Sequence, residues 1–276
     1  MFEMVPINLA LEQSLSVTAL VTTVVMFGMW LFSLRLRNAA IVDSYWGPGF
    51  LVISAISASL TQQLGPRAMV VLGLVALWSL RLGIYLTWRN HGMDEDYRYA
   101  QMRAHHGAAF GRVSLVTVFG LQGLLMWVIS TPLQAAILIP EPGTLTLLDG
   151  LGIALWVIGF LFESVGDWQL ARFKADPTNT ARVMDRGLWA YTRHPNYFGE
   201  TMIWWGYGLL ALATTAGGWT LFGPVLMTFL LLKVSGVSLL ERGMADRRPD
   251  YASYVTRTSA FFPWPPRKPL GPEQSR

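Results

Sequence analysis

The chain has 276 residues, of which 53% are hydrophobic and only 14% are charged, and its formal net charge is +4. Soluble domains usually carry about 25% charged residues, so this composition excludes an ordinary water-soluble domain and favours a protein surrounded by lipid. The chain has no cysteine, which excludes disulfide bonds and thiolate metal sites.

Long apolar runs recur along the chain. Residues 1–13 contain Glu3 and Glu12 and lack the basic start of a cleavable signal peptide, so we expect the first run to remain a membrane helix. The runs that approach the ~20 residues needed to cross a bilayer are 14–34, 45–63, 68–88, 113–138, 147–170, 197–217 and 219–240. Only helices satisfy the backbone of such runs in lipid. We therefore predict an all-α integral membrane protein, a bundle of about seven transmembrane helices.

Basic residues follow alternate apolar runs. They gather in the loop after the first run, which holds Arg35 and Arg37, in the loops 89–112 and 171–196 and in the tail 241–276, whereas the loops on the opposite side carry only Arg67. The positive-inside rule then places the N-terminus outside and the C-terminus in the cytoplasm. We expect one membrane domain, 1–276, in a bacterial inner (cell) membrane. Its active site would face the cytoplasm, where the basic loops and tail hold any polar cofactor.

Two acids lie near the end of the fifth run. Glu163 and Asp167 are four residues apart and share one helix face. Acids at membrane depth usually face a bundle interior or a water-filled cavity. Basic residues follow them: Arg172, Lys174, Arg182, Arg186 and Arg193. One interpretation is interfacial ion pairing and contact with lipid headgroups; the other is a nucleotide site, because a nucleotide presents both hydroxyls and phosphates.

The stretch YTRHPNYFGE, from Tyr191 to Glu200, gathers polar residues directly before an apolar run. Pro195 discourages helical geometry at His194 and suits the first turn of a new helix. Asn196 and Glu200 then share one face, and the free N–H groups of the helix start favour a phosphate or carboxamide. A structural role for His194 is the alternative.

The third run contains Arg81, Tyr85 and Trp88 on one helix face. An arginine inside a membrane requires a partner or a cavity. Asp43, at the start of the second run, lies on the same predicted side. A structural Arg81–Asp43 ion pair and a substrate site are both compatible with this pattern.

Two other patterns do not predict cofactor sites. HGMDEDYRYAQMRAHHG holds three histidines among acids, but their spacing does not suit a metal, and we expect none. GLGIALWVIG, from Gly150, loosely mimics a dinucleotide-binding loop. Because no strand precedes it and it lies in an apolar run, we reject a Rossmann site.

Three motifs carry a family resemblance: WSLRLGIYLTWRNHGMDEDYRY, RGLWAYTRHPNYFGE and DRRPDYASYVTRTSAFFPWPP. From Arg81 to Pro266 the chain resembles the DUF1295 group, which is similar to the steroid 5-alpha-reductases. The wider superfamily includes sterol C14 and C7 reductases and isoprenylcysteine carboxyl methyltransferases. The resemblance implies a seven-helix membrane reductase that takes NADPH from the cytoplasmic side.

The resemblance also implies roles for particular residues. The family's nucleotide-binding positions correspond to Asp167, Lys174, Arg182 and Asn196, and the segment that closes over the cofactor corresponds to Tyr251, Tyr254 and Arg257. Glu163 stands where the steroid reductases prefer asparagine. Their early Gln-Glu pair, which holds the substrate ketone, has no counterpart here, where the chain reads VDSYWG.

The leading hypothesis is NADPH-dependent reduction of a carbon–carbon double bond conjugated to a ketone in a steroid-like or other lipophilic substrate. An acid bonded to the ketone oxygen would stabilise the enolate that forms. The candidate catalytic residues are Glu200, Tyr85 and Asp43. The candidate cofactor-binding residues are Glu163, Asp167, Arg172, Lys174, Arg182, Tyr191, Arg193, His194, Asn196, Tyr197, Tyr254 and Arg257.

Two alternatives belong to other classes. One is an S-adenosylmethionine-dependent membrane methyltransferase that uses Glu241 and Arg242, although that cofactor has no phosphate to occupy the arginines. The other is a non-enzymatic lipid-binding or transport protein, which would favour polar pairs at mid-membrane and symmetric halves. We expect membrane lipids and a lipophilic molecule as partners and no nucleic acid.

Overall fold

The computed structural model describes residues 9–139, 143–234 and 248–267, together with Val237, Glu241 and Met244. Every element in this described part is helical, apart from an isolated parallel bridge between Thr192 and Ser259. The predicted all-α class is therefore confirmed. By its internal contacts the chain divides into two compact units, Met1–Gly150 with Gly208–Gly223 and Leu151–Tyr207 with Pro224–Arg276. The expected single membrane domain, 1–276, stays a prediction.

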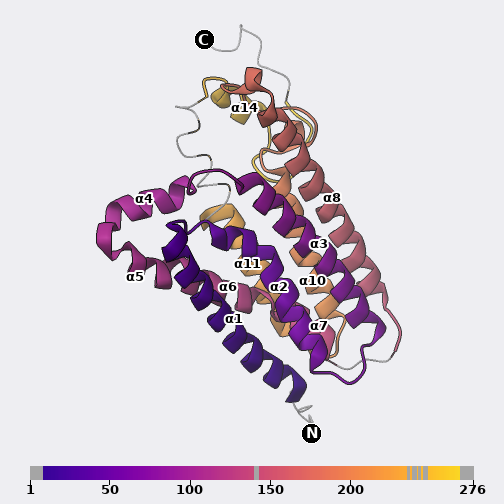
Figure 1. The fold of residues 1–276 in the computed structure, drawn as a ribbon. Helices are drawn as coiled ribbons and strands as arrows, with labels where there is room; N and C mark the ends of the chain where they lie inside the picture. Colours follow the sequence, from indigo (N-terminus) through magenta and orange to yellow (C-terminus); the bar gives the residue numbers. More distant parts are fainter. Residues whose placement is uncertain are drawn as a thin grey trace. The chain divides into compact units, whose positions relative to one another are not determined.

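The first unit contains most of the N-terminal helices (Figure 1). In chain order its elements are α1 (Leu9–Leu36), α2 (Ile41–Ser59), α3 (Pro66–Asn90), α4 (Tyr97–His106), η1 (Gly107–Ala109), α5 (Phe110–Ser114), η2 (Leu115–Gly120), α6 (Leu121–Ile129), α7 (Thr131–Leu138) and η4 (Gly217–Leu221). The segment η2 is π-helical. The segment predicted as a loop at 89–112 contains α4 and the start of α5. A polar segment can be helical because a helix satisfies its backbone hydrogen bonds whatever its side chains are.

The second unit is built around two long helices. Its elements are α8 (Leu147–Ala175), η3 (Pro177–Asn179), α9 (Leu188–Tyr191), α10 (Pro195–Leu212), α11 (Phe222–Phe229), η5 (Leu230–Val234) and α14 (Tyr251–Arg257). The boundary between the units falls within α8, α10 and α11. The predicted tail 241–276 contains α14, and its end, 268–276, lies outside the described residues.

Helical segments long and apolar enough to cross a membrane define an integral membrane protein. Within the described residues there are 6: Leu9–Leu36, Ile41–Ser59, Pro66–Asn90, Tyr97–Leu138, Leu147–Ala175 and Gly217–Val234. The remaining predicted span, 197–217, corresponds to α10, which is not among them. That helix starts with polar residues, including Asn196 and Glu200. The count of seven and the placement of the termini stay predictions.

The helices α2 and α3 pack closely through residues that lack bulky side chains. Pro48 lies inside α2, and its ring occupies the space left by Gly83 of α3, where a Cβ would lie 2.8 Å from the proline Cγ. A Cβ on Gly47 would lie 3.0 Å from the carbonyl oxygen of Ser79. Small residues let membrane helices approach closely, so WGPGF is a packing motif.

A buried hydrogen-bond network joins α1, α2 and α7. Ser14 donates to the Oε1 atom of Gln134 at 2.9 Å, and its hydroxyl lies 2.9 Å from that of Ser57. The amide nitrogen of Gln134 donates to Ser130 at 3.0 Å. All four side chains are buried. Because lipid offers no hydrogen bonds, these polar groups specify which helix faces meet.

Glycines at heptad spacing bring α8 and α10 together: Gly152, Gly159 and Gly166 on α8, and Gly199 and Gly206 on α10. A Cβ on Gly159 would lie 2.5 Å from the carbonyl oxygen of Gly199, and a Cβ on Gly199 would lie 2.5 Å from that of Gly159. A seven-residue repeat keeps one seam of a helix facing its neighbour. The glycine-rich run that mimics a nucleotide loop therefore contributes to helix packing.

Candidate functional site

The polar ends of α8 and α10 meet in the second unit. Glu163 and Asp167 of α8 are buried, with 3% and 5% of their surface exposed. The side-chain amide of Asn196 donates to the Oδ1 atom of Asp167 at 3.1 Å. The structure thus brings together two of the predicted cofactor-binding residues, Asp167 on α8 and Asn196 on α10.

This meeting depends on how α10 begins. As predicted, Pro195 is the first residue of the helix, where its missing N–H has no cost. Its ring packs against α8 at Gly166, where a Cβ would lie 3.2 Å from the proline Cγ. The side-chain oxygen of Asn196 accepts a hydrogen bond from the Tyr197 N–H at 3.1 Å. The Pro-Asn pair therefore sets the position of Asn196 beside Asp167.

Arg193 and His194 converge on one carboxylate. The Nε and Nη2 atoms of Arg193 donate to the two oxygens of Glu241 at 2.8 and 3.1 Å, and Nη1 donates to the carbonyl of Thr258 at 2.7 Å. His194 Nε2 lies 3.0 Å from Glu241 Oε1, and because an ionised carboxylate only accepts, this contact requires a hydrogen on Nε2. Both side chains are buried. Arg193 and His194 therefore link Glu241 to the start of α10, and their hydrogen-bond donors are directed at protein acceptors.

The C-terminal segment lies along the residues that precede α10. The backbone N–H of Arg193 donates to the carbonyl of Ser259 at 2.9 Å, and the hydroxyl of Thr192 donates to that of Phe261 at 2.8 Å. The phenol of Tyr254, which is 2% exposed, donates to the carbonyl of Trp189. Tyr254 therefore holds the tail against the polar end of the unit.

The ionisation of this cluster is shifted by its surroundings. Burial by itself would raise the pKa of Glu241, but the hydrogen bonds from His194 and Arg193 outweigh it and lower that pKa to about 2. Burial and the neighbouring carboxylate of Glu241 raise the pKa of Tyr251 to about 12. Burial also raises the pKa of Tyr254. Glu241 is thus anionic, and both phenols neutral, near pH 7.

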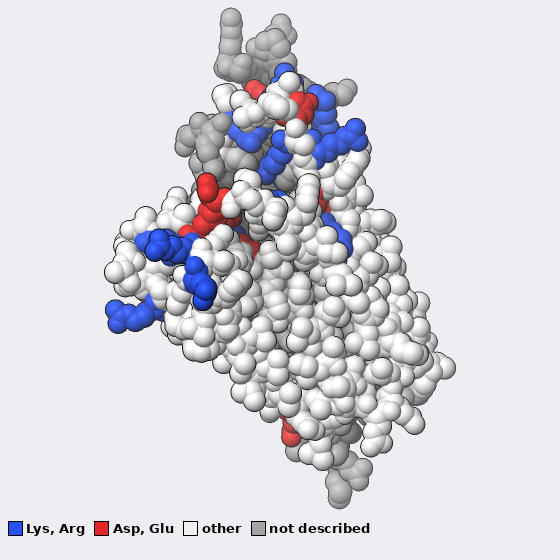
Figure 2. Space-filling view, in the orientation of Figure 1, with Lys and Arg blue, Asp and Glu red and all other residues white. Residues whose placement is uncertain are grey.

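Exposed cations surround the same end of the unit. Arg172, Lys174, Arg182 and Arg186 all have exposed side chains. The Arg172 guanidinium lies 5.6 Å from the ring centroid of Trp168, whereas Arg257 is paired with Asp185 at 2.7 Å. Figure 2 shows Lys and Arg atoms gathered around α14, at the end where α8 leaves its apolar stretch. These side chains are accessible to an anionic ligand.

Two predicted aromatic contributors differ in exposure. The side chain of Tyr191 is 47% exposed at the end of α9, while its carbonyl accepts from the Trp264 N–H at 2.9 Å. Tyr197 stacks on His194 with an interplanar angle of 4° and packs against a cluster that includes Phe198. Tyr191 is therefore accessible to a ligand, and Tyr197 supports the imidazole.

Two of the three predicted catalytic residues, Asp43 and Tyr85, lie in the first unit. Asp43 accepts hydrogen bonds from the Tyr99 phenol at 2.7 Å and from Arg98 Nη2 at 2.8 Å. The ring of Tyr85 is flanked by two guanidinium groups, Arg81 at 5.5 Å and Arg89 at 5.9 Å. Asp43 thus joins α2 to α4. Glu200 belongs to the second unit, on α10, and its side chain is half-buried.

The acidic motif before α4 serves ion pairing. Glu95 accepts from Arg103 at 2.8 Å and from the Ala39 N–H at 2.7 Å. Burial would raise the pKa of Glu95, but these two hydrogen bonds lower it. Asp96 caps α4 by accepting from the Arg98 N–H. Within the described ranges no group of three or more His, Asp or Glu side chains is placed to hold a metal ion.

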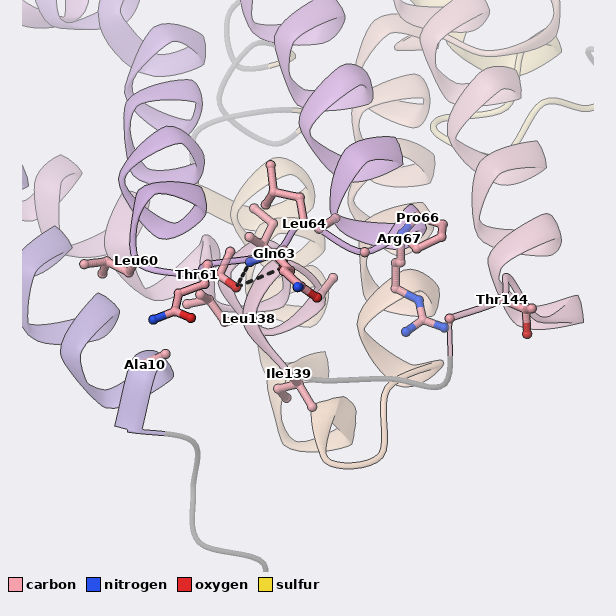
Figure 3. A pocket seen from close by; sticks show the side chains of 16 residues that line it. Ala10, Leu60, Thr61, Gln63, Leu64, Pro66, Arg67, Leu138, Ile139 and Thr144 are labelled. Carbon is pink, nitrogen blue, oxygen red and sulfur yellow. Dashed lines mark hydrogen bonds between the residues drawn. The ribbon is translucent and has the colours of Figure 1, made fainter.

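Two cavities of the first unit are lined by none of the predicted site residues. The larger, of about 510 Å³, is lined by residues 60–68 and 136–139 together with Ala10, Gly143 and Thr144 (Figure 3). Beside it Arg67 forms a buried ion pair with Asp149, which caps the start of α8. The smaller, of about 300 Å³, lies between α1 and η2–α6. Because neither cavity belongs to the second unit, the candidate site there is identified from its side-chain contacts.

Some residues of the site have partners that the sequence pattern does not indicate. The sequence indicates Glu241 only as a methyltransferase ligand, and the structure makes it the shared acceptor of Arg193 and His194. Its neighbour in that hypothesis, Arg242, lies outside the described residues. No sequence pattern indicates the roles of Tyr99, which donates to Asp43, and of Asp185, which pairs with Arg257. The sequence contains one indication of the role of Glu241, because this residue is the first acid after the last apolar run.

The helical fold, the membrane-crossing segments and the charged end of α8 and α10 define an integral membrane protein with a polar site at the end of its helices. The chain matches the family described as "Protein of unknown function (DUF1295)" over residues 29–258, and it belongs to that family. An uncharacterized protein of Schizosaccharomyces pombe, C594.04c, is 23% identical over an alignment of 262 residues, and the match covers 85% of this chain and 75% of the yeast protein. No solved structure matches the chain. The DUF1295 resemblance expected from the motifs is confirmed.

Proposed function

We propose that this protein is an NADPH-dependent oxidoreductase that reduces a carbon–carbon double bond conjugated to a ketone in a lipophilic, steroid-like substrate. One observation carries the proposal. The buried acids Glu163 and Asp167 of α8 and the half-buried Asn196 of α10, which donates to Asp167, lie at the end of an apolar helical stretch, and exposed cations follow them in the chain. An amphiphilic pair of reactants, one charged and one oily, suits such a boundary.

The residues present fit a phosphorylated dinucleotide. Arg182 and Arg186 make no ion pair within the described part of the chain, and their exposed guanidinium groups suit phosphate. Asp167 and Asn196 offer the acceptors and donors that ribose hydroxyls and a carboxamide require. Arg193 and His194 are predicted to bind the cofactor. Because both side chains donate to Glu241, we propose that they support the cofactor site indirectly.

The chain's own contribution is to orient and polarise the substrate. NADPH, when bound, would supply the hydride. An acid at the ketone oxygen makes the double bond electrophilic and stabilises the enolate. Glu200, one helical turn beyond Asn196, is the leading candidate for this acid, with Tyr85 as the second. Asp43 is a weaker candidate, because both its oxygens already accept hydrogen bonds.

The proposal includes a membrane topology. Seven spans, with α10 as the sixth, would place the basic loops and the tail in the cytoplasm, where NADPH is available. A bacterial inner membrane is the expected location. Cysteine substitutions in the loops of this cysteine-free chain, labelled from outside intact cells, would test the orientation. Labelling at position 182 from outside would overturn it.

Equilibrium binding in detergent tests the cofactor directly. We expect NADPH to bind and S-adenosylmethionine to bind far more weakly, because the exposed cations have no phosphate to contact in the latter. Consumption of NADPH on addition of a ketosteroid with a conjugated double bond would then identify the reaction. Tight binding of S-adenosylmethionine without NADPH binding would replace the proposal by the methyltransferase alternative.

A further inference from the structure

An apolar groove of about 300 Å³ runs between α1 and the η2–α6 segment of the first unit. Its walls are Ala19, Thr22, Thr23, Met26 and Phe27 from α1, and Leu115, Phe119, Gly120, Gly123, Leu124 and Trp127 from the opposite segment. Both walls belong to segments able to cross a membrane. None of the residues proposed for reduction lines this groove.

Two indole groups fix the ends of this groove. Trp30 of α1 donates to the carbonyl of Gly111 at 2.8 Å, and Trp127 of α6 donates to the carbonyl of Leu15 at 3.0 Å. The two segments are therefore antiparallel and held at both ends. Between these contacts η2 is π-helical. This geometry is rare in proteins as a whole, but where it occurs it is often at a functional site. The groove is thus a defined feature of the fold.

The groove is accessible from the membrane side. Phe27 is 48% exposed and Leu124 is 56% exposed, and Gly120 between them has no side chain to fill the space. In a membrane-spanning segment the surrounding medium is hydrocarbon. An acyl chain therefore matches both the lining and the surroundings.

Cations gather beyond one end of the groove. Arg35 follows Phe27 by about two turns of α1, roughly 12 Å, Arg37 lies just beyond the end of that helix, and Arg112 precedes Leu115 by about one turn. All three are exposed, and none is paired with an acid among residues 9–139, 143–234 or the other described positions. Figure 2 shows Lys and Arg atoms near α4 and α5, beside a surface without charge. A phosphate-bearing headgroup has complementary charge.

We propose that the groove binds one anionic phospholipid, with an acyl chain between α1 and η2–α6 and the phosphate against Arg35, Arg37 and Arg112. The apolar walls recognise the chain, and the arginines select an anionic headgroup over a zwitterionic one. This site is independent of the proposed reductase activity.

Native mass spectrometry of the detergent-purified protein tests the proposal with dioleoyl phosphatidylglycerol and dioleoyl phosphatidylcholine, which have the same chains. We expect phosphatidylglycerol to bind more tightly, by about fivefold for each arginine engaged. Ala19→Phe fills the groove and should abolish binding of both lipids. Val24→Phe, on the same helix but 61% exposed, is the matched control and should bind as the unmodified chain does.

The headgroup part of the site has its own test. Arg35→Gln with Arg112→Gln should remove the preference for phosphatidylglycerol, whereas Arg186→Gln should retain it. Leu124→Trp fills the groove from the other wall, in case Ala19→Phe does not fold. Equal binding of the two lipids, unchanged binding by both filled variants, or displacement of the lipid by inorganic phosphate would each overturn the proposal. A filled variant that changes only the oligomeric state would also do so.

Discussion

Arg193 holds Glu241 through two parallel hydrogen bonds, Nε to Oε1 at 2.8 Å and Nη2 to Oε2 at 3.1 Å. The residues lie 48 positions apart in the chain, before the first turn of α10 and after the last described π-helical segment. Such a bidentate pair is both charged and geometrically selective. It joins the start of α10 to the C-terminal part of the second unit.

Glu241→Gln should lower stability by about 2 kcal/mol at neutral pH, because hydrogen bonds to a charged group contribute about that much. It should also alter the acid dependence. The pKa of Glu241 falls from 4.5 to about 2 on folding, so its stabilisation is present above pH 4.5 and is lost between there and pH 2. Thermal unfolding in detergent across this range measures both effects.

The control for that experiment is Glu12→Gln, which changes an exposed acid of α1. It should leave the acid dependence unchanged. If Glu241→Gln and the unmodified chain lose stability equally between pH 4.5 and 2, the ion pair does not contribute as described.

Arg182→Ala should weaken NADPH binding by at least about tenfold while affecting NADH much less, if this exposed guanidinium contacts the phosphate that only NADPH carries. Fluorescence titration of the reduced nicotinamide gives both dissociation constants. Arg112→Ala removes an exposed arginine of the first unit and serves as the control. Equal weakening of the two cofactors would reject the role of Arg182.

Glu200→Gln should lower turnover on the order of a hundredfold or more while NADPH binding largely survives, because a glutamine cannot transfer a proton to the ketone oxygen or back. Single-turnover kinetics alongside cofactor titration separates the two effects. A fully active variant would remove Glu200 as the acid and leave Tyr85, for which Tyr85→Phe is the parallel test.

Gly159→Ala should destabilise the second unit by roughly 1–3 kcal/mol, because the new Cβ would lie 2.5 Å from the Gly199 carbonyl oxygen and α10 must shift. Gly150→Ala, on the same helix, meets nothing within 4 Å and should be neutral or slightly stabilising. Thermal unfolding of the two variants makes the comparison. Equal stability would show that α8 and α10 do not approach as closely as the structure has them.

Much of the architecture follows from local pattern. Apolar runs of membrane length predicted helices, and six such segments are present in the described chain. Pro195 predicted the start of α10, because a proline has no N–H and a fixed φ and so suits a first turn. The four-residue spacing of Glu163 and Asp167 placed both on one face of α8, and both are buried there.

The sequence by itself therefore determined the helices, the membrane setting and which side chains share a face, because these depend on residues within a few turns of one another. Only the tertiary structure decided that Arg193 and His194 meet Glu241, that Asn196 meets Asp167, and that Asp43 meets Tyr99. These contacts depend on how closely neighbouring helices pack, and glycine and proline residues on the contacting faces determine that distance. Local periodicity carries no record of that approach.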